Sequence, residues 1–381
     1  MTALPLRAGR RAAGPRLVVD LGAIAANTRL LAARATGELM AVVKADGFGH
    51  GAVDVARTSL AHGATRLGVT SIEEALALRA AGIGAPVLSW LNPVDADFAT
   101  AVAADVELAV HGRAHLEAIA ARAPGARVHL QLDTGMARDG AAPPVWGDLC
   151  RGARLAERRG LVHVVGVMGH LANADTPADP GNALGRTRFV WGLEMARAAG
   201  LRPVDRHLAA TSATLTDPLS HHTMSRVGAG LVGIDPSRTT TLRPALTLTA
   251  PLVGVRRVRA GTPVGYGHTW TAPEPTTLGL VPLGYADGLP RAASGRAEVL
   301  VRGRRRPLVG RISMDMAVVD LGSSHGGETG DLVTVFGPGD HGEPTVVEWA
   351  AWADTIEHEI VTGLGTRLAR TARAHALRSV R

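Results

Sequence analysis

The chain has 381 residues, of which 46% are hydrophobic and 20% charged, and its formal net charge is +7. A chain of this length predicts two domains, or one large barrel with an addition. Its single cysteine excludes an internal disulfide and a cysteine-based metal cluster. There is no run of apolar residues long enough to span a membrane, and residues 1–15 lack the apolar core of a secretory signal. We therefore expect a cytoplasmic protein without a membrane partner.

The positive charge raises nucleic acid as a partner, but the arginines do not form a single patch. They lie in separate segments around residues 151–159, 256–259 and 302–306, and are not interleaved with aromatic residues. No helix-turn-helix or zinc-finger spacing is present. We expect no nucleic-acid partner, and the charge is more suited to attracting anionic ligands.

Short apolar runs alternate with helix-like segments through the first 240 residues. A strand at Leu17–Asp20 and a helix at Ile24–Ala35 come first. Eight further strands are predicted at Met40–Lys44, Leu67–Thr70, Val87–Leu91, Val106–Val110, Val128–Asp133, Val162–Gly169, His207–Ala210 and Val227–Val232. Helices are predicted between them, among others at Ala52–Ala61, Ile72–Ala81, Arg113–Arg122 and Ala183–Ala199. Eight strands joined by helical crossovers predict an α/β fold, a parallel (β/α)8 barrel of the TIM type.

After about residue 240 the helical periodicity stops. Short β-rich runs cut by glycine and proline follow at Ala245–Ala250, Thr277–Val281, Glu298–Val301, Met316–Asp320 and Leu332–Phe336, and a helix is predicted at Val346–Leu364. We therefore predict a barrel domain over residues 14–240 and a mainly-β domain over residues 241–381, with residues 1–13 packing against the latter. A doubly wound sheet would need a glycine-rich turn after its first strand, which is missing.

The chain has one lysine against forty arginines. That lysine, Lys44, ends the first predicted barrel strand and precedes a glycine-rich turn. An arginine-rich coding bias could leave such a lysine by chance, but its place at the end of a buried strand favours a function. A lysine amine can form a Schiff base with an aldehyde, whereas arginine cannot. Any covalently held carbonyl cofactor would therefore be attached at Lys44.

Other polar residues also follow barrel strands, at the edge where such barrels place their chemistry. Arg138 follows the fifth strand, His170 ends the sixth, Ser212 follows the seventh and Arg226 stands at the start of the eighth. Each alone has an ordinary structural explanation, but their coincidence at one rim favours a site. The loops after the last two strands often bind phosphate in such barrels, through groups such as the Ser212 hydroxyl and the backbone amides of Gly228 and Ala229. An amine and a phosphate site together suit pyridoxal 5′-phosphate.

At these residues the chain resembles the alanine racemase family, over most of its length and in order. The similarity rests on several motifs: Val42-Val43-Lys44-Ala45 with Gly49-His50-Gly51, Leu132-Asp133-Thr134-Gly135-Met136 with Arg138, Gly169-His170, Ser212-Ala213, Arg226 with Gly228, Tyr266, Gly284-Tyr285-Ala286-Asp287-Gly288, and Gly310-Arg311-Ile312-Ser313-Met314-Asp315. The resemblance implies a pyridoxal-phosphate barrel followed by a β domain. It also implies a head-to-tail homodimer, in which each active site receives a tyrosine and a methionine from the other subunit.

The resemblance implies a two-base reaction on alanine. Lys44 would hold the cofactor and act as one base, and Tyr266 of the partner subunit would be the base on the opposite face. Arg138 would lie beside that phenol and attract the substrate carboxylate. Arg226 would bond to the pyridine nitrogen and keep it unprotonated, which discourages transamination, and His170 would position Arg226.

Further residues would complete the site. Tyr285, Met314 and Asp315 would bind substrate at the entrance. Ser212, Gly228, Ala229 and His358 would hold the phosphate. No metal is expected.

Four positions depart from the usual family pattern. Phe48 stands in place of a tyrosine that bonds to the phosphate, so we predict weaker cofactor retention. His358 stands in place of another tyrosine on the phosphate side and partly offsets this loss. Gln131 stands in place of a lysine that is often carbamylated, so we predict a bound chloride or stronger attraction of the substrate carboxylate near Arg138. Thr211 replaces an asparagine, which is a smaller change.

The leading interpretation is a cytoplasmic racemase that supplies D-alanine for peptidoglycan. A racemase of the same fold for another amino acid in a specialised pathway is the first alternative. A non-catalytic pyridoxal-phosphate carrier is disfavoured by the β domain and by Tyr266. A decarboxylase of the related barrel family is disfavoured because the only cysteine, Cys150, lies in the barrel.

Overall fold

The computed structural model describes residues 14–323 and 327–373. The chain divides into two compact units. One is Leu21–Arg243, and the other combines strand β1 (Arg16–Asp20) with the residues from Pro244 onward. The expected packing of residues 1–13 lies outside the described residues. Within the described ranges, no helix has the length and apolar character needed to cross a membrane.

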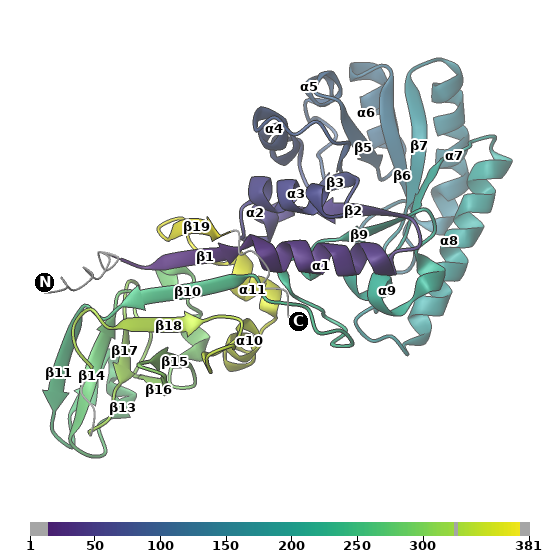
Figure 1. Cartoon of the computed structure of the whole chain (residues 1–381). Coiled ribbons are helices and arrows are strands. Elements are labelled where there is room, and N and C mark those ends of the chain that lie inside the picture. The colour runs from purple at the N-terminus through teal and green to yellow at the C-terminus, as the bar shows by residue number, and fades with distance from the viewer. Residues whose placement is uncertain (1–13, 324–326, 374–381) are drawn as a thin grey trace, which may run out of the picture. The chain divides into compact units, whose positions relative to one another are not determined.

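The first unit is the predicted barrel, and this fold class is confirmed. Eight parallel strands form one nearly closed sheet in the order β8-β7-β6-β5-β4-β3-β2-β9. They are β2 (Glu38–Val42), β3 (Arg66–Val69), β4 (Val87–Ser89), β5 (Val106–Val110), β6 (Ala126–Gln131), β7 (Val162–Met168), β8 (Asp205–His207) and β9 (Met224–Val227). The helices of the unit are α1 (Leu21–Arg34), α2 (Lys44–Phe48), α3 (Ala52–Ala61), α4 (Ile72–Ala80), α5 (Phe98–Ala103), α6 (Arg113–Arg122), α7 (Pro143–Arg158), α8 (Pro180–Ala198) and α9 (Thr211–Thr216). Figure 1 shows α7 and α8 side by side on the outside of this sheet.

The last barrel strand differs from the sequence prediction. The predicted strand Val227–Val232 is in fact β9 followed by a short 3-10 turn, η2 (Ala229–Val232). The turn begins at Gly228, whose carbonyl accepts a hydrogen bond from the backbone amide of Leu231 at 3.0 Å. As a result, Arg226 lies near the carboxyl end of β9 and not at the start of the strand.

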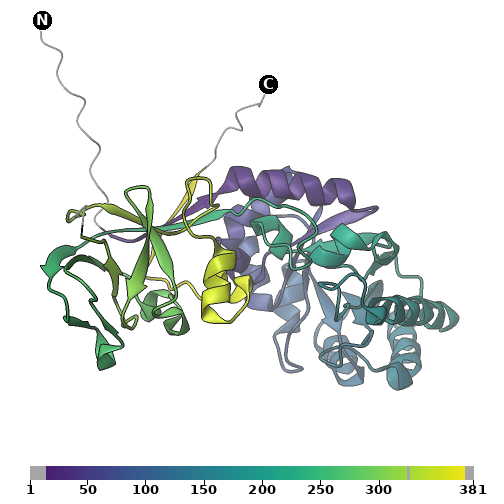
Figure 2. The ribbon, with the colours of Figure 1, turned by 90° about the horizontal axis from the view of Figure 1, so that it is seen from below.

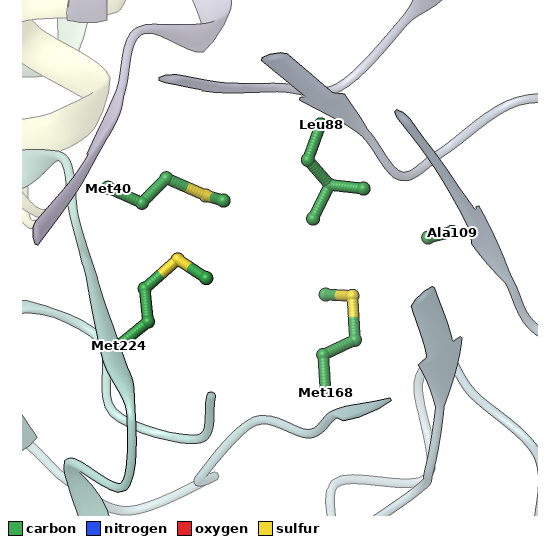
Figure 3. Packing of buried hydrophobic residues seen from close by; sticks show 5 residues of the cluster. All are labelled: Met40, Leu88, Ala109, Met168 and Met224. Atoms are coloured by element: carbon green, nitrogen blue, oxygen red, sulfur yellow. The ribbon is translucent and has the colours of Figure 1, made fainter. Parts of the chain in front are cut away.

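Sulfur-rich side chains fill part of the barrel interior. Three methionines from β2, β7 and β9 meet Leu88 and Ala109 in one buried cluster (Figure 3): Met40, Met168 and Met224. The partly buried Trp90 packs against this cluster. Gly68 on β3 leaves room for this packing, because a Cβ there would lie 2.6 Å from the Trp90 ring and 2.9 Å from the sulfur of Met40. This part of the interior is therefore a packed core.

The second unit is mainly β. Its large sheet has the order β11-β14-β17-β16-β15-β18-β10-β1-β19. Strand β1 pairs antiparallel with β10 and parallel with β19. The remaining strands are β10 (Leu246–Pro251), β11 (Gly254–Val258), β12 (Pro263–Val264), β13 (Trp270–Thr271), β14 (Thr276–Val281), β15 (Glu298–Val301), β16 (Arg304–Val309), β17 (Ala317–Asp320), β18 (Leu332–Phe336) and β19 (Ala369–Arg373).

The predicted helix Val346–Leu364 is two helices, α10 (Val346–Ala353) and α11 (Glu357–Thr362), seen in yellow in Figure 2. The break falls at Asp354, which has a positive φ of 55°. A helix cannot continue through this left-handed residue, so the chain turns before α11 begins.

Candidate active site

Lys44 follows β2 at the carboxyl end of the strand, where α2 begins. The next five residues, from Ala45 to Gly49, all have positive φ angles between 50° and 77°. Three of them are not glycine, and a left-handed conformation costs roughly 1–2 kcal/mol for each such residue. Strain of this kind gathers at functional sites, where surrounding contacts hold it in place.

The charge state of Lys44 is shifted by its surroundings. Burial lowers the pKa of the amine, Arg138 and Arg226 lower it further, and Glu74 acts in the opposite direction. A lowered pKa increases the fraction of neutral amine near pH 7, which is the form that attacks a carbonyl carbon. The site therefore gathers cations around an amine whose own charge is disfavoured.

Arg226 is buried and held by several acceptors. Its Nη1 donates to the Nδ1 atom of His207 at 2.9 Å and to the His207 carbonyl at 2.7 Å. Its Nη2 donates to the Gly169 carbonyl at 2.6 Å and to His170 Nδ1 at 3.3 Å. Burial lowers the pKa of Arg226 to about 10, so the guanidinium stays charged at neutral pH. The structure thus brings Arg226 and His170 together and fixes the direction of the guanidinium.

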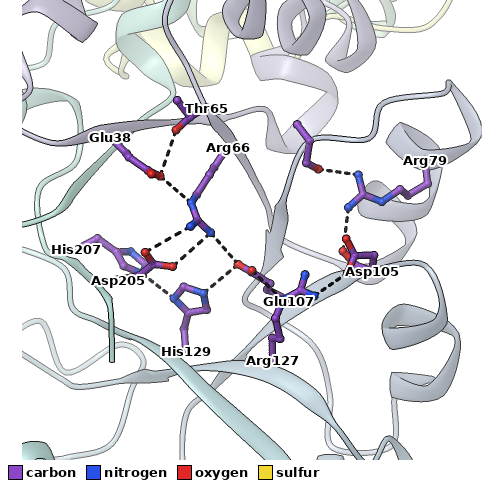
Figure 4. A network of polar contacts seen from close by, with 11 residues as sticks. Glu38, Thr65, Arg66, Arg79, Asp105, Glu107, Arg127, His129, Asp205 and His207 are labelled. Carbon is purple, nitrogen blue, oxygen red and sulfur yellow. Dashed lines mark hydrogen bonds and ion pairs between the residues drawn. The ribbon is translucent and has the colours of Figure 1, made fainter. Parts of the chain in front are cut away.

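A row of hydrogen bonds runs from Arg226 into the barrel interior (Figure 4 shows it from His207 on). Because a guanidinium has no acceptor, His207 Nδ1 must accept and His207 Nε2 must carry the hydrogen. That hydrogen is donated to His129 Nδ1 at 2.9 Å, and His129 Nε2 in turn donates to Glu107 at 3.1 Å. The tautomers of both imidazoles therefore follow from the charge of Arg226. Burial and the charge of Arg226 hold the pKa of His207 well below its usual value, which keeps the ring neutral.

The row ends in a group of charged side chains around Glu107. Atoms of Glu107, His129 and Asp205 lie within 4.8 Å of one another, a spacing that could suit a metal ion. However, the guanidinium of Arg66 already bridges the two carboxylates, at 3.5 Å from Glu107 and 3.3 Å from Asp205. Although burial raises the pKa of Glu107, His129, Arg66 and Arg127 together bring it down to about 2. We therefore interpret this group as an ion-pair network that anchors the row.

The loops after β6 and β7 are tied together at the rim. Asp133 Oδ1 accepts hydrogen bonds at 2.9–3.1 Å from three backbone amides, those of Gly135, Met136 and Ala137. The Thr134 hydroxyl donates to the His170 carbonyl at 2.5 Å. These bonds shape the segment that carries Arg138, whose side chain is exposed, and they fix it relative to His170.

A carboxylate beside Arg138 was missed by the sequence analysis. Gln131 Nε2 donates to Asp139 at 3.1 Å, and His111 Nδ1 lies 2.6 Å from the other oxygen of Asp139. Although burial raises the pKa of Asp139, its contact with His111 lowers it overall, so the group stays ionised. Gln131, Arg138, Asp139 and His170 line the same small cavity. Asp139 thus adds a negative charge beside Arg138, in a cavity that Asp133 also lines, and a bound chloride there stays a prediction.

The expected phosphate loop is held by Thr211 and Phe48. The Thr211 hydroxyl accepts a hydrogen bond from the backbone amide of Gly228 at 3.4 Å, which links the segments after β8 and β9. A Cβ on Gly228 would lie 2.6 Å from the ring of Phe48, so only glycine fits against this ring. Ser212 and Ala229 are buried beside these residues, at the start of α9 and of η2.

Tyr266 lies in the second unit, and its side chain is 72% exposed. It begins a short 3-10 turn between Gly265 and Gly267, both of which have a φ of 72°. Tyr266 lines a surface depression together with Gly265 and the segment Ser313–Met316. The Tyr266 phenol therefore lies at the surface of this unit, and its expected role in the site of a partner subunit stays a prediction.

The Gly284–Gly288 motif places Tyr285 against the segment that carries Met314. The backbone amides of Tyr285 and Ala286 donate to the carbonyls of Ser313 and Met314, at 3.0 and 2.9 Å. This approach requires Gly284, because a Cβ there would lie 2.3 Å from both carbonyl oxygens.

Arg367 connects the two acidic residues of this region. It binds the buried Asp287 at 3.0 Å and Asp315 at 2.7 Å. The carboxylate of Asp315 is thus engaged in an ion pair, although Asp315 is exposed at this surface together with Tyr285 and Met314.

Two remaining residues are placed by the structure. His358 lies on α11 and is half-buried, and its proposed contact with phosphate stays a prediction. Cys150 is buried on α7, and burial raises the pKa of its thiol to about 12. A thiol that stays protonated at neutral pH is a poor nucleophile.

Family models match both parts of the chain. Residues 19–236 match the N-terminal domain of alanine racemase, and residues 245–372 match its C-terminal domain. The chain belongs to the alanine racemase family. It is thus an enzyme, an amino-acid racemase of the isomerase class, and the family resemblance expected from its motifs is confirmed.

Named relatives and solved structures of the racemase family are similar to this chain over nearly its whole length. The chain is 47% identical over 368 residues to the alanine racemase of Mycolicibacterium smegmatis, covering 94% of this chain and 95% of the relative. It is 44% identical to the solved alanine racemase of Streptomyces coelicolor A3(2), with a TM-score of 0.92 and coverage of 95% and 98%. The Bartonella henselae alanine racemase, solved with covalently bound pyridoxal phosphate, is 27% identical with a TM-score of 0.86, covering 95% of this chain and all of that one.

Several contacts of this racemase site were not predicted from the sequence. His129 and Glu107 each lie between two apolar residues and look like ordinary strand positions in the sequence, and His207 follows two charged residues without a recognisable motif. Asp139 follows Arg138 directly, so its place next to the arginine could have been noticed. Thr211 was considered only as a replacement for asparagine, whereas its hydroxyl joins two loops.

Proposed function

We propose that this racemase interconverts L- and D-alanine with pyridoxal 5′-phosphate bound at the carboxyl ends of the barrel strands. The observation that carries the proposal is the environment of Lys44, the only lysine of the chain. Its pKa is lowered by burial and by two arginines, as an amine that condenses with an aldehyde requires. The covalently bound cofactor of the Bartonella henselae relative supports the same assignment.

The residues present fit this cofactor. Arg138 and Arg226 act on Lys44, and both of these cations also act on His170. A cluster of positive charge suits the phosphate of this cofactor and the carboxylate of an amino-acid substrate. When bound, the cofactor supplies the aldehyde and a ring that withdraws electrons from the substrate α carbon. Ser212, Gly228, Ala229 and His358 would hold the phosphate.

The remaining residues would bind substrate and move protons. Lys44 removes or returns the α proton on one face, and Tyr266 of the partner subunit does so on the other, because racemisation requires both faces. Arg226, with two neutral imidazoles as neighbours, would keep the pyridine nitrogen unprotonated. Arg138, Tyr285, Met314 and Asp315 would receive the substrate carboxylate. The proposal includes a homodimer in the cytoplasm that supplies D-alanine for peptidoglycan.

The first test concerns the cofactor and the reaction. Borohydride reduction of the enzyme with pyridoxal phosphate, followed by peptide mapping, is expected to label Lys44 alone. Incubation with a panel of L-amino acids and chiral analysis is expected to give D-alanine as the main product. A colourless, unlabelled protein, or a preference for another amino acid, would overturn this part of the proposal.

The second test concerns the shared site. Lys44→Ala and Tyr266→Phe chains are each expected to be inactive, since each lacks one base. Mixed dimers of the two are expected to regain one working site, because one interface combines an intact lysine with an intact tyrosine. If both bases came from the same chain, every mixed dimer would stay inactive.

A third test separates the two bases. In the Tyr266→Phe variant, the α proton of one alanine enantiomer is expected to exchange with solvent deuterium, while the other enantiomer is inert. Exchange of both enantiomers at undiminished rates would exclude Tyr266 as a base.

A further inference from the structure

Glu74 on α4 contacts the turn that carries Lys44. It is the third residue of that helix and forms a capping box with Ser71. One carboxylate oxygen, Oε2, accepts hydrogen bonds from the backbone amides of Thr70 at 2.8 Å and Ser71 at 3.4 Å. The other oxygen, Oε1, accepts from the backbone amide of Ala45 at 2.7 Å. A single carboxylate thus joins the start of α4 to the residue next to Lys44.

The hydrogen bond to Glu74 is made at the first residue of a strained segment. Ala45 is the first residue of the left-handed turn, and its φ of 50° is unfavourable for a residue with a Cβ. The second residue of the turn, Asp46, is tied to the chain beyond the turn, because its side chain accepts a hydrogen bond from the backbone amide of Ala52 at 2.9 Å. The entry of the turn is bonded to Glu74, on the helix that follows β3, the strand next to β2.

We propose that Glu74 is a positioning residue for Lys44, because it clamps the first residue of the Lys44 turn to helix α4. This inference rests on the proposed role of Lys44 as the amine that holds the cofactor. It adds a residue that touches neither substrate nor cofactor and that acts through the backbone of Ala45.

The geometry requires a carboxylate. All three hydrogen bonds to Glu74 come from backbone N–H donors, and they are spread over both oxygens. A glutamine has one acceptor and one donor end, so its NH2 group would face an N–H donor on one side. Glu74→Gln must therefore give up either the helix cap or the clamp on Ala45.

Removing the carboxylate has two separable effects on Lys44. Among the charged groups that act on its amine, Arg138 and Arg226 lower the pKa and Glu74 is the one that raises it. His170 faces the same group, and burial together with Arg226, Arg138 and Lys44 keeps its ring neutral by lowering its pKa to about 3. The loss of Glu74 should therefore lower the pKa of Lys44 while releasing the turn that aims the amine. A purely electrostatic role would make cofactor capture easier, and a helix-capping role would leave the amine unchanged.

The single lysine makes the amine directly observable. Lysine labelled with ¹³C at Cε should give one signal from the full-length apo-enzyme, and its pH dependence reports the pKa of Lys44. The variants are Glu74→Gln and, as a matched control, Glu73→Gln, which removes the neighbouring exposed carboxylate on the same helical turn. Cofactor affinity is measured in parallel by titrating each apo-enzyme with pyridoxal phosphate and following the visible absorbance.

We expect the pKa of Lys44 to fall in Glu74→Gln and to stay at the wild-type value in Glu73→Gln. Despite the more neutral amine, affinity for pyridoxal phosphate should fall roughly tenfold in Glu74→Gln, as the loss of a charge-assisted hydrogen bond would produce. An unchanged pKa, or affinity equal to the wild type, would overturn the inference. If the wild-type enzyme itself fails to bind pyridoxal phosphate, the proposed function fails, while the titration still reports whether Glu74 acts on Lys44.

A second variant covers the case in which Glu74→Gln does not fold. Glu74→Asp keeps the charge but is one methylene shorter, so it can no longer reach both α4 and Ala45. We expect a pKa of Lys44 close to the wild type with reduced cofactor affinity. Wild-type affinity in this variant, or failure of both variants to fold, would mean that Glu74 serves the helix cap alone.

Discussion

The contact between Gly228 and Phe48 allows a quantitative prediction. In Gly228→Ala, the new Cβ would lie 2.6 Å from two ring carbons of Phe48 and 3.2 Å from Cβ of Val42. Carbon atoms pack at about 3.5–4.0 Å, so the ring would have to retreat by about 1 Å. The φ of Gly228 is −130°, outside the left-handed region, so the substitution does not force a positive φ and its main cost is the steric overlap with Phe48.

Overpacking of this kind costs about 1–3 kcal/mol. For a domain of this size, each kcal/mol lowers the melting temperature by about 2–4 °C. We therefore expect Gly228→Ala to lower the melting temperature of the apo-enzyme by roughly 2–12 °C. Affinity for pyridoxal phosphate should fall as well, because the displaced backbone amide belongs to the proposed phosphate loop.

A double-mutant cycle isolates the contact. Phe48→Leu removes the ring carbons that the new methyl group would meet at 2.6 Å, so in that background Gly228→Ala should cost only what the 3.2 Å approach to Val42 Cβ adds. Calorimetric melting of the wild type, both single variants and the double variant gives the coupling, which should approach the full cost of about 1–3 kcal/mol. Equal losses in the two backgrounds would show that the Phe48 ring does not limit residue 228, and the steric argument would fail.

Three further predictions concern the cofactor, pH and anions. Phe48→Tyr should tighten cofactor binding about tenfold or more, through one hydrogen bond to a charged phosphate, and an absorbance titration of apo-enzyme would detect its absence. The pKa of His170 is lowered to about 3 and that of Glu107 to about 2, so the native state binds fewer protons than the unfolded chain. Both groups therefore stabilise the fold at neutral pH. The contribution of His170 to the free energy of unfolding is lost as the pH falls from about 6.5 to 3, and the contribution of Glu107 is lost as the pH falls from about 4.5 to 2. Unfolding of the apo-enzyme followed across pH should then show a shallower decline in His170→Gln from pH 6.5 downward, whereas Glu107→Gln should differ from wild type in slope only below about 4.5. Asp139→Asn removes the carboxylate beside Arg138 and should increase the affinity for chloride, so chloride should inhibit the variant at lower concentrations than the wild type. Unchanged inhibition by chloride would show that Asp139 does not act on an anion site.

Much of the fold was predictable because it depends on local patterns. The barrel strands follow apolar runs, and helices such as Arg113–Arg122 were predicted to the residue, since periodicity and flanking turns define them. The end of β9 was predicted wrongly, because the chain turns at Gly228 within a run of residues that looks like a strand. The break at Asp354 was missed for a similar reason, since one left-handed residue divides an otherwise helical segment.

In the candidate site too, some features could be predicted from the sequence and others could not. Lys44 and Arg226 stand out in the sequence because their residue types are unusual at strand ends. Their supporting contacts depend on side chains far apart in the chain, such as His129 with His207 and Ala45 with Glu74. No periodicity records such pairs, so only the three-dimensional structure reveals that the site has a second layer of support.

The position of β1 has a consequence for the order in which the chain can fold during synthesis. Arg16–Asp20 pairs with Leu246–Pro251 and with Ala369–Arg373, so both of its neighbours leave the ribosome long after it does. The barrel unit, Leu21–Arg243, is made between these events and can fold first. At translation rates of about 5–20 residues per second, β1 waits for its last partner for roughly 20–70 s. Until then at least one edge of β1 is open to wrong pairing with other nascent chains, and the shortness of the strand limits that risk.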